Sequence, residues 1–231
     1  MNGDIKVIGF DADDTLWVNE PYYRETEQIF ADLLKDYLSK DSINKNLFST
    51  EMRNLKLYGY GAKGFMLSMI ETAIKISENK LSNEVILKII DLGKELLNKP
   101  LVLLDGVEQV LKSLKGRYTL IIATKGDLLD QERKLEKSGL SSYFHHIEIM
   151  SDKKASNYDK LIKHLDIKPE QFVMIGNSIN SDIKPVLKLG SYAIHVPYHT
   201  TWIHEEGDGI KIENDKFAEV KTLLDILNYF E

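Results

Sequence analysis

Three carboxylates crowd into four positions near the start of the chain. Asp11, Asp13 and Asp14 directly follow the apolar run VIGF at positions 7–10. Carboxylates so close together repel one another and are costly to remove from water, so a cation, a lysine or a solvated loop must compensate their charge. A lysine that meets these carboxylates, or any further ligand of a cation, must come from other parts of the sequence.

Polar residues of suitable kinds follow three later apolar runs. They are Thr124, Lys125 and Gly126 after the second run, Lys153 after the third, and Asn177, Ser178 and Asp182 after the fourth. Carboxylate and amide oxygens bind hard metal ions, and hydroxyl, ammonium and backbone N–H groups hold phosphate oxygens. The set is rich in metal and phosphate chemistry.

Short β-rich runs alternate with helical patterns through the second half of the chain. The runs lie at 5–10, 118–124, 145–150, 172–176 and 192–196, and the helical patterns at 106–115, 128–139, 157–165 and 181–190. This alternation predicts right-handed βαβ units and a largely parallel sheet. Because ligands bind beyond the carboxyl ends of parallel strands, we expect the polar residues to converge there.

Residues 18–100 break this alternation. They contain long amphipathic stretches, such as 22–38 and 83–97, and no convincing strand. The stretch YGYGAKGF at 58–65 interrupts the helical pattern with three glycines, which indicates a turn between helices. We therefore expect two domains: a sheet domain of residues 1–17 and 101–231, and a helical insertion of residues 18–100.

Composition narrows the classes of partner and compartment. The chain has 231 residues, 43% of them hydrophobic, and its 30 basic residues are dispersed among 36 acidic ones. No basic stripe favours nucleic acid, and charges interrupt every apolar stretch before it could span a membrane. With no cysteine and no signal-peptide pattern, we expect a cytoplasmic protein. His195, His199 and His204 are irregularly spaced, which favours a packed loop over a zinc site.

Four short motifs, in this order, resemble those of the haloacid dehalogenase superfamily of aspartate-nucleophile phosphatases. They are DADDT at 11–15, ATKGD at 123–127, SDKKASNY at 151–158 and GNSINSD at 176–182. The motifs cover the whole sheet domain, and the helical insertion stands where that superfamily places its helical caps. The resemblance implies an α/β three-layer sandwich with a mainly parallel Rossmann-like sheet and an inserted all-helical cap domain.

The resemblance also implies roles for individual residues. Asp11 is expected to attack phosphorus and form an aspartyl phosphate, which divides a difficult hydrolysis into two easier steps. Asp13 points to the same side of the strand and is expected to act as general acid and base. Thr124 and the turn at Lys125 and Gly126 are expected to hold the phosphoryl oxygens, although the Lys125 ammonium fits a solvated position equally well.

Two assignments stay open at this point. Lys153 and Lys154 both fit the third motif's catalytic lysine, and the spacing to Tyr158 favours Lys153. Asp14 stands where relatives often carry glycine, and strand alternation turns it away from the reacting phosphorus. We expect Asp14 to be a solvated or capping residue.

The fourth motif departs from the commonest pattern, because Asn177 replaces an aspartate. The resemblance implies Mg²⁺ as cofactor, held by Asp11, the backbone carbonyl of Asp13, Asn177 and Asp182, the last directly or through water. An amide oxygen can bind Mg²⁺ but brings no charge. We therefore expect a weaker metal site.

Together these features predict a Mg²⁺-dependent phosphatase that hydrolyses a small phosphomonoester. Two alternatives stay open: a phosphomutase of the same fold, and a regulatory or binding member without turnover. The expected partner is a small phosphorylated molecule, with neither nucleic acid nor a membrane involved.

Overall fold

The computed structural model of the chain describes residues 4–200, 202 and 212–230. The chain divides into two compact units, which we call the sheet unit and the helical unit. The sheet unit comprises Met1–Glu20, Leu101–Lys125 and Gln131–Glu231, and the helical unit comprises Pro21–Pro100 and Gly126–Asp130. The domain boundaries expected at 17/18 and 100/101 stay a prediction.

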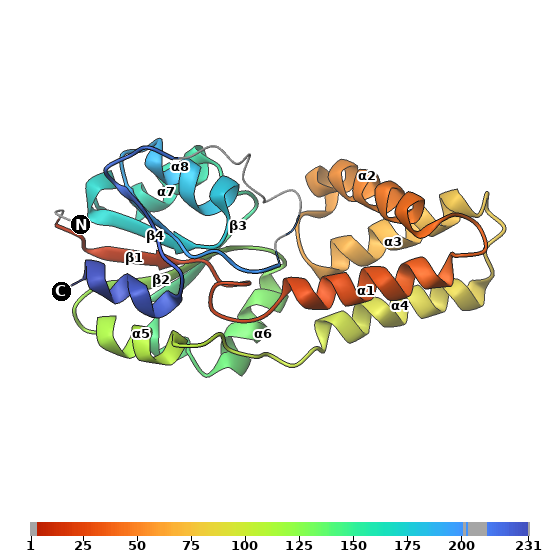
Figure 1. The fold of residues 1–231 in the computed structure, drawn as a ribbon, viewed down its shortest axis with the longest axis horizontal. Coiled ribbons are helices and arrows are strands. Elements are labelled where there is room, and N and C mark those ends of the chain that lie inside the picture. The colour runs from red at the N-terminus through yellow and green to blue at the C-terminus, as the bar shows by residue number, and fades with distance from the viewer. Residues whose placement is uncertain (1–3, 201, 203–211, 231) are drawn as a thin grey trace. The chain divides into compact units, whose positions relative to one another are not determined.

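The sheet unit is built on six parallel strands in the order β3-β2-β1-β4-β5-β6 (Figure 1). Their bounds are β1 Val7–Phe10, β2 Thr119–Lys125, β3 His146–Met150, β4 Phe172–Gly176, β5 Tyr192–His195 and β6 Phe217–Glu219. The predicted α/β fold with a mainly parallel sheet is thus confirmed. The edge strand β6 was not predicted, because its three residues carry no apolar alternation.

Helices cover both faces of this sheet (Figure 1). One face carries α5 (Val107–Leu114), α6 (Leu128–Ser138) and a 3-10 helix (Leu223–Tyr229), and the other carries α7 (Ala155–His164) and α8 (Lys184–Leu187). The central strand β1 is therefore buried along its whole length. Ile8 and Phe10 pack in the first of two cores and Val7 in the second. This two-sided burial explains why VIGF is continuously apolar.

Strand register brings the first, second and fourth motifs to one edge. Phe10 pairs with Ile122 of β2 and Ile175 of β4. Asp11, the next residue, therefore lies near the carboxyl ends of both neighbouring strands. The Asp11 N–H continues the ladder by donating to the Ile175 carbonyl at 2.8 Å.

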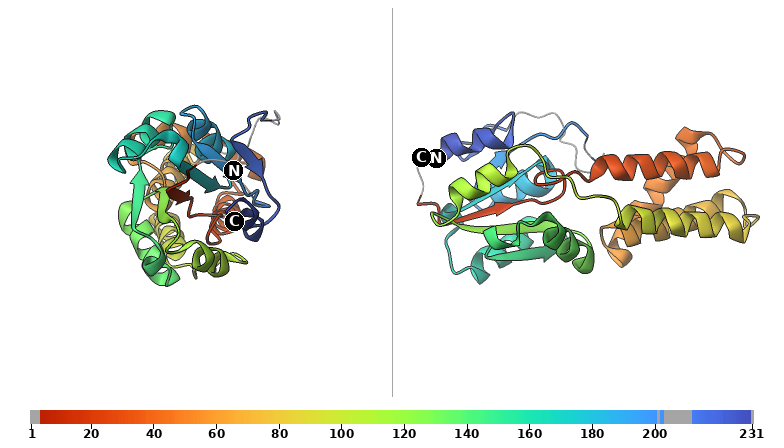
Figure 2. Two further views of the ribbon diagram at one scale, coloured as in Figure 1. Left: turned by 90° about the vertical axis from the view of Figure 1, so that its left-hand side faces the viewer. Right: turned by 90° about the horizontal axis from the view of Figure 1, so that it is seen from below.

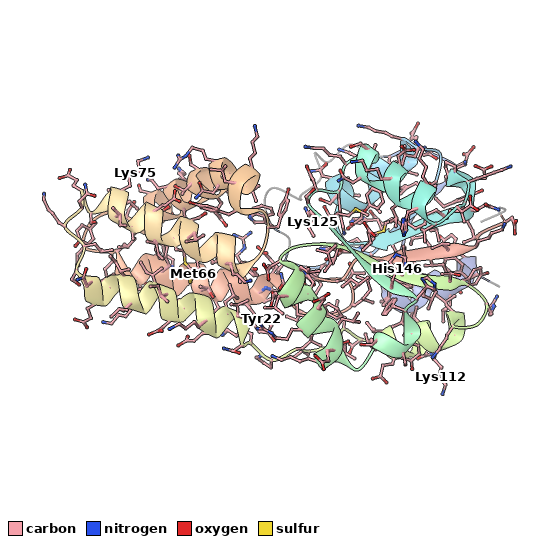
Figure 3. The ribbon with its side chains drawn as sticks, turned by 180° about the vertical axis from the view of Figure 1, so that it is seen from behind. Tyr22, Met66, Lys75, Lys112, Lys125 and His146 are labelled. Carbon is pink, nitrogen blue, oxygen red and sulfur yellow. The ribbon has the colours of Figure 1, made fainter. Side chains whose placement is uncertain are left out.

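The helical unit contains four helices. Their bounds are α1 Glu20–Leu33, α2 Lys40–Tyr58, α3 Ala62–Ile76 and α4 Asn83–Leu97. The views in Figure 2 show α1 and α4 running alongside each other, and Lys99 after α4 pairs with Glu25 of α1 at 2.6 Å. Met66 of α3, labelled in Figure 3, lies directly over Gly93 of α4, where a side chain would collide with it.

The segment that leads from β1 to α1 and the segment that leads from α4 to α5 lie side by side within the sheet unit. The Val18 N–H donates to the Val102 carbonyl, and the Leu104 N–H donates to the Leu16 carbonyl, each at 2.9 Å. Trp17 and Leu103 form an antiparallel bridge between these two bonds. The outgoing and returning chains are thus paired like two short strands.

One predicted helix differs in the structure. In place of the helix expected at 181–190 there are a π-helical turn at Ile179–Ile183 and the short α8, and the C-terminal segment Leu223–Tyr229 is a 3-10 helix. Pro185 at the start of α8 fits there because the first helical turn needs no N–H donor from it. Within the part of the chain that the structure describes, no helix is long and apolar enough to cross a membrane.

Candidate active site

The carboxylate of Asp11 is buried at the end of β1 and shares a hydroxyl with Asn177. Thr15 Oγ1 lies 3.2 Å from Asp11 Oδ2 and 3.2 Å from Asn177 Oδ1. A hydroxyl has one proton, so it donates to one of these oxygens at a time. The Thr15 hydroxyl therefore brings these two oxygens close together.

Lys153 is the ammonium group that meets the first carboxylate. Its Nζ donates to Asp11 Oδ1, and to Asp182 Oδ1 at 2.7 Å, and the residue is 3% exposed. Burial by itself would lower the pKa of Lys153, but the Asp11 and Asp182 carboxylates outweigh burial and hold that pKa well above its ordinary value. Lys154 instead reaches the surface and pairs with Asp152 at 2.7 Å. The geometry therefore favours Lys153 over Lys154.

Asp182 is fixed by the backbone as well as by Lys153. Its Oδ2 accepts the Ser178 N–H at 2.9 Å, and the π-helical turn sets this contact between residues four apart. Gly176 lies beneath the carboxylate, where a Cβ atom would overlap the Asp182 side chain. Glycine is therefore required at the end of β4 for Asp182 to reach Lys153.

Asp13 has a separate set of donors. Trp17 Nε1 and Lys134 Nζ donate to its Oδ1 at 2.7 and 2.9 Å, and Gln131 Nε2 donates to its Oδ2 at 2.8 Å. Trp17 is fully buried, and Gln131 is 2% exposed. These three residues were not singled out in the sequence, although Gln131 and Lys134 are three apart on α6 and share a helix face.

The second motif joins the site through Lys125. Its Nζ donates to Ser181 Oγ at 2.9 Å, so the side chain labelled in Figure 3 is tied to the fourth motif. Thr124 is buried, and its hydroxyl donates to the Lys125 carbonyl at 3.2 Å. Gly126 follows with φ 132, a conformation that favours glycine, and falls in the helical unit.

Asp14 is buried rather than solvated, so one half of the expectation for it is wrong. The residue has φ 60, and its carboxylate accepts the Asn19 N–H at 2.9 Å and the Glu20 N–H at 2.9 and 3.1 Å. It therefore caps the start of α1, as the other half of the expectation said. The pKa of Asp14 is raised to about 7, mainly by burial. The Asp13 carboxylate also raises this pKa, whereas the hydrogen bonds from the Asn19 and Glu20 N–H groups lower it.

His195 ends β5 and contacts the backbone of Asn177 and the side chain of Glu219. Its Nε2 faces the Asn177 carbonyl at 3.0 Å, and its Nδ1 faces Glu219 Oε2 at 2.9 Å. The ring of His199 packs against that of Tyr198. His204 lies outside the described residues.

The oxygen donors at this site suit Mg²⁺. Among the residues that the structure describes, no three His, Cys, Asp or Glu side chains lie where they could share a metal ion. Asn177 brings an amide oxygen in place of one carboxylate. Asp11 Oδ2 and Asn177 Oδ1 both lie 3.2 Å from Thr15 Oγ1, and Lys153 Nζ joins Asp11 to the Asp182 carboxylate. Mg²⁺ accepts such a set because it usually keeps several waters.

The chain matches a known family along most of its length. A sequence profile of haloacid dehalogenase-like hydrolases matches residues 5–190. A haloacid dehalogenase-like family hydrolase from Xanthomonas campestris has 39% identity and a TM-score of 0.84, over 96% of this chain and 88% of that one. None of the curated proteins compared with the chain matches it.

More distant structures share the fold. One, described as a predicted phosphoglycolate phosphatase from Haemophilus somnus, has 18% identity and a TM-score of 0.66 over 100% of both chains. Another, a HAD-hydrolase from Bacillus subtilis described as bound to magnesium, has 17% identity and a TM-score of 0.66, over 97% of this chain and 98% of that one. At such identities the likeness concerns the fold alone.

Proposed function

Since this chain belongs to the haloacid dehalogenase-like hydrolases, we propose that it is a Mg²⁺-dependent phosphatase acting on a small phosphomonoester. The observation that carries the proposal is the separation of two carboxylates at the end of β1. Asp11 is paired with Lys153, whereas Asp13 has Trp17 and Gln131 among its own donors. One carboxylate can therefore attack while the other moves protons.

In the first step, an Asp11 oxygen attacks phosphorus and the bond to the leaving oxygen breaks. Asp13 gives that oxygen a proton, and the phosphoryl group stays on Asp11 as an aspartyl phosphate. Asp13, now ionised, then takes a proton from a water that attacks the aspartyl phosphate. Inorganic phosphate leaves, and Asp11 and Asp13 regain their starting states.

Charge around the phosphoryl group is balanced by this chain's own cations. Lys153 lies against Asp11, and Lys125 reaches the same cluster through Ser181. The backbone N–H groups after Thr124 add donors for phosphoryl oxygens. Such positioning and charge stabilisation are the main demands of phosphoryl transfer.

Asp11, Asn177 and Asp182, with the backbone carbonyl of Asp13, would hold Mg²⁺ in this proposal. The ion supplies additional positive charge for the phosphoryl oxygens when bound. Because a neutral amide replaces one carboxylate, we expect the affinity for Mg²⁺ to be weak.

Asp13 also favours a phosphatase over a dehalogenase. Superfamily members that act on haloacids lack a carboxylate two residues after the nucleophile. Asn177 favours a second candidate, a binding member without turnover, because loss of a metal-binding carboxylate weakens the electrostatic contribution to catalysis. We also propose that the protein is cytoplasmic and that its partner is a small phosphorylated molecule.

The test is phosphate release from p-nitrophenyl phosphate and a panel of phosphorylated metabolites, with and without Mg²⁺. The matched control is Asp11→Asn, checked for folding by circular dichroism, and chloride release from 2-chloropropionate tests the dehalogenase reaction. An active wild type with a silent Asp11→Asn supports the proposal. Equal activity in both proteins refutes the nucleophile, and a wild type silent on every phosphate supports the binding candidate.

A further inference from the structure

We propose that Lys134 and Gln131 of α6 are positioning residues that choose which oxygen of Asp13 carries the transferred proton. The inference rests on the proposed phosphatase function, in which Asp13 is the general acid and base. It concerns α6, which lies outside the four motifs of the sequence.

The hydrogen bonds divide the two oxygens of Asp13 unequally. Oδ1 accepts from Trp17 Nε1 at 2.7 Å and from Lys134 Nζ at 2.9 Å, whereas Oδ2 accepts from Gln131 Nε2 at 2.8 Å. A carboxylate offers about four acceptor positions, two on each oxygen. Both positions on Oδ1 are filled by groups that only donate, and one position on Oδ2 is left. The proton therefore belongs on Oδ2.

The donors are themselves held in place, so the carboxylate cannot turn freely. Lys134 Nζ also donates to Asn19 Oδ1 at 2.8 Å, and Gln131 Nε2 also donates to the Lys125 carbonyl at 3.0 Å. These second contacts fix α6 against the first loop and against the end of β2. Rotation of the Asp13 carboxylate would break three hydrogen bonds together.

The amide of Gln131 shows that this arrangement is retained at a cost. Its Nε2 faces two oxygens that can only accept, which settles the orientation of the amide. Its Oε1 is buried and has no hydrogen-bond partner among the described residues. A buried amide oxygen without a donor destabilises a fold, so positioning Asp13 gives a reason for keeping glutamine there.

Two ammonium groups pair with three carboxylates in this site. Lys153 is shared by Asp11 and Asp182, and Lys134 is bound to Asp13. Each reacting carboxylate thus has its own cation, and neither lysine must move when the other's partner reacts. Lys134 acts only through Asp13, with which it forms an ion pair whose side chains are about one-fifth exposed.

The test compares substrates with different leaving groups. We would measure kcat and KM for an alkyl phosphate from the panel and for p-nitrophenyl phosphate, whose leaving group departs without a proton. In Lys134→Met and Gln131→Leu we expect kcat for the alkyl phosphate to fall about 10- to 100-fold with little change in KM. The rate of leaving-group release in the first turnover, measured before Asp13 acts as a base, should fall about as much for the alkyl phosphate but less than about threefold for p-nitrophenyl phosphate.

Two further variants separate positioning from a structural role. Lys134→Arg keeps a charged donor and should recover most of the lost kcat, whereas Lys137→Met, at an exposed lysine of the same helix, should match wild type. Equal losses of the first-turnover rate on both substrates, or no loss on either, would overturn the proposal. If the wild type itself hydrolyses neither phosphate, the proposed function fails, and crystal structures of wild type and Lys134→Met decide the positioning. An Asp13 carboxylate unchanged between them would then overturn it.

Discussion

Replacing Glu51 of α2 by glutamine should stabilise the protein at alkaline pH. The pKa of the Glu51 carboxyl is raised to about 8, mainly by burial and also by the nearby Glu27 carboxylate, while Arg24 opposes both. Arg24 is already paired with Glu27 at 3.1 Å. One guanidinium therefore faces two half-buried carboxylates, and Glu51 is ionised at a cost.

The size of the effect follows from that pKa. An ordinary glutamate has a pKa of 4.5, so raising it to about 8 costs the ionised form at most about 5 kcal/mol. Partial exposure and salt reduce this figure, and we expect about 2 kcal/mol. Because the pKa is raised in the folded state, the stability is fully present below pH 4.5 and is lost as the pH rises through about 8. Glutamine, which does not ionise, avoids the loss.

The assay is urea unfolding at pH 5.5 and pH 9, followed by circular dichroism. At pH 5.5, one unit above the ordinary pKa, Glu51→Gln should be more stable than wild type by only about 0.5 kcal/mol, and at pH 9 by about 2 kcal/mol. The control is Glu84→Gln, at an exposed residue of α4 paired with Lys88, which should change stability by less than about 0.5 kcal/mol at either pH. A stability difference between wild type and Glu51→Gln that does not grow with pH would refute the reasoning.

Three further predictions concern the site. Lys153→Met should abolish phosphate release and lower the free energy of unfolding by about 3–5 kcal/mol in urea titrations, because it leaves Asp11 and Asp182 buried without their cation. Gly176→Ala should lower kcat at least about 10-fold while the circular dichroism spectrum stays unchanged, because its Cβ displaces the Asp182 carboxylate; wild-type kcat would contradict this. EDTA should remove activity. Asn177→Asp should lower the Mg²⁺ concentration needed for half-activation about 10-fold, because the added negative charge strengthens the binding of a hard ion. An unchanged activation curve would contradict the assignment of Asn177 as a metal ligand.

The sheet was predictable because each of its inner strands is buried on both faces. Continuous apolar runs such as VIGF result from that burial, and their alternation with helical patterns indicates a parallel sheet. The edge strand β6 packs on one side of β5 over three residues, which is too short to leave a pattern. The π-helical turn at Ile179–Ile183 could not be predicted from the sequence either. It goes together with the hydrogen bond between Asp182 and Lys153, two residues that are far apart along the chain.

The site was predictable only where the spacing along one strand or one loop decides it. Asp11 and Asp13 are two residues apart, and both lie at the end of β1 as expected. The environment of Asp13 depends instead on the rotation of α6, which brings Gln131 and Lys134 toward the first loop. For Asp14 the sequence left a solvated and a capping position open, because its left-handed conformation turns it back onto the start of α1 and no simple alternation of side chains describes that turn.

The pairing of Val18 with Val102 makes residues 21–100 a removable insertion. Since the outgoing and returning chains already meet, a tight turn of a few residues can join them without stretching either one. Excision of residues 21–100 would then leave the polypeptide path through β1 and α5 intact. The same paired segments allow a foreign domain of any size to be inserted in place of residues 21–100, provided that its two ends lie close together.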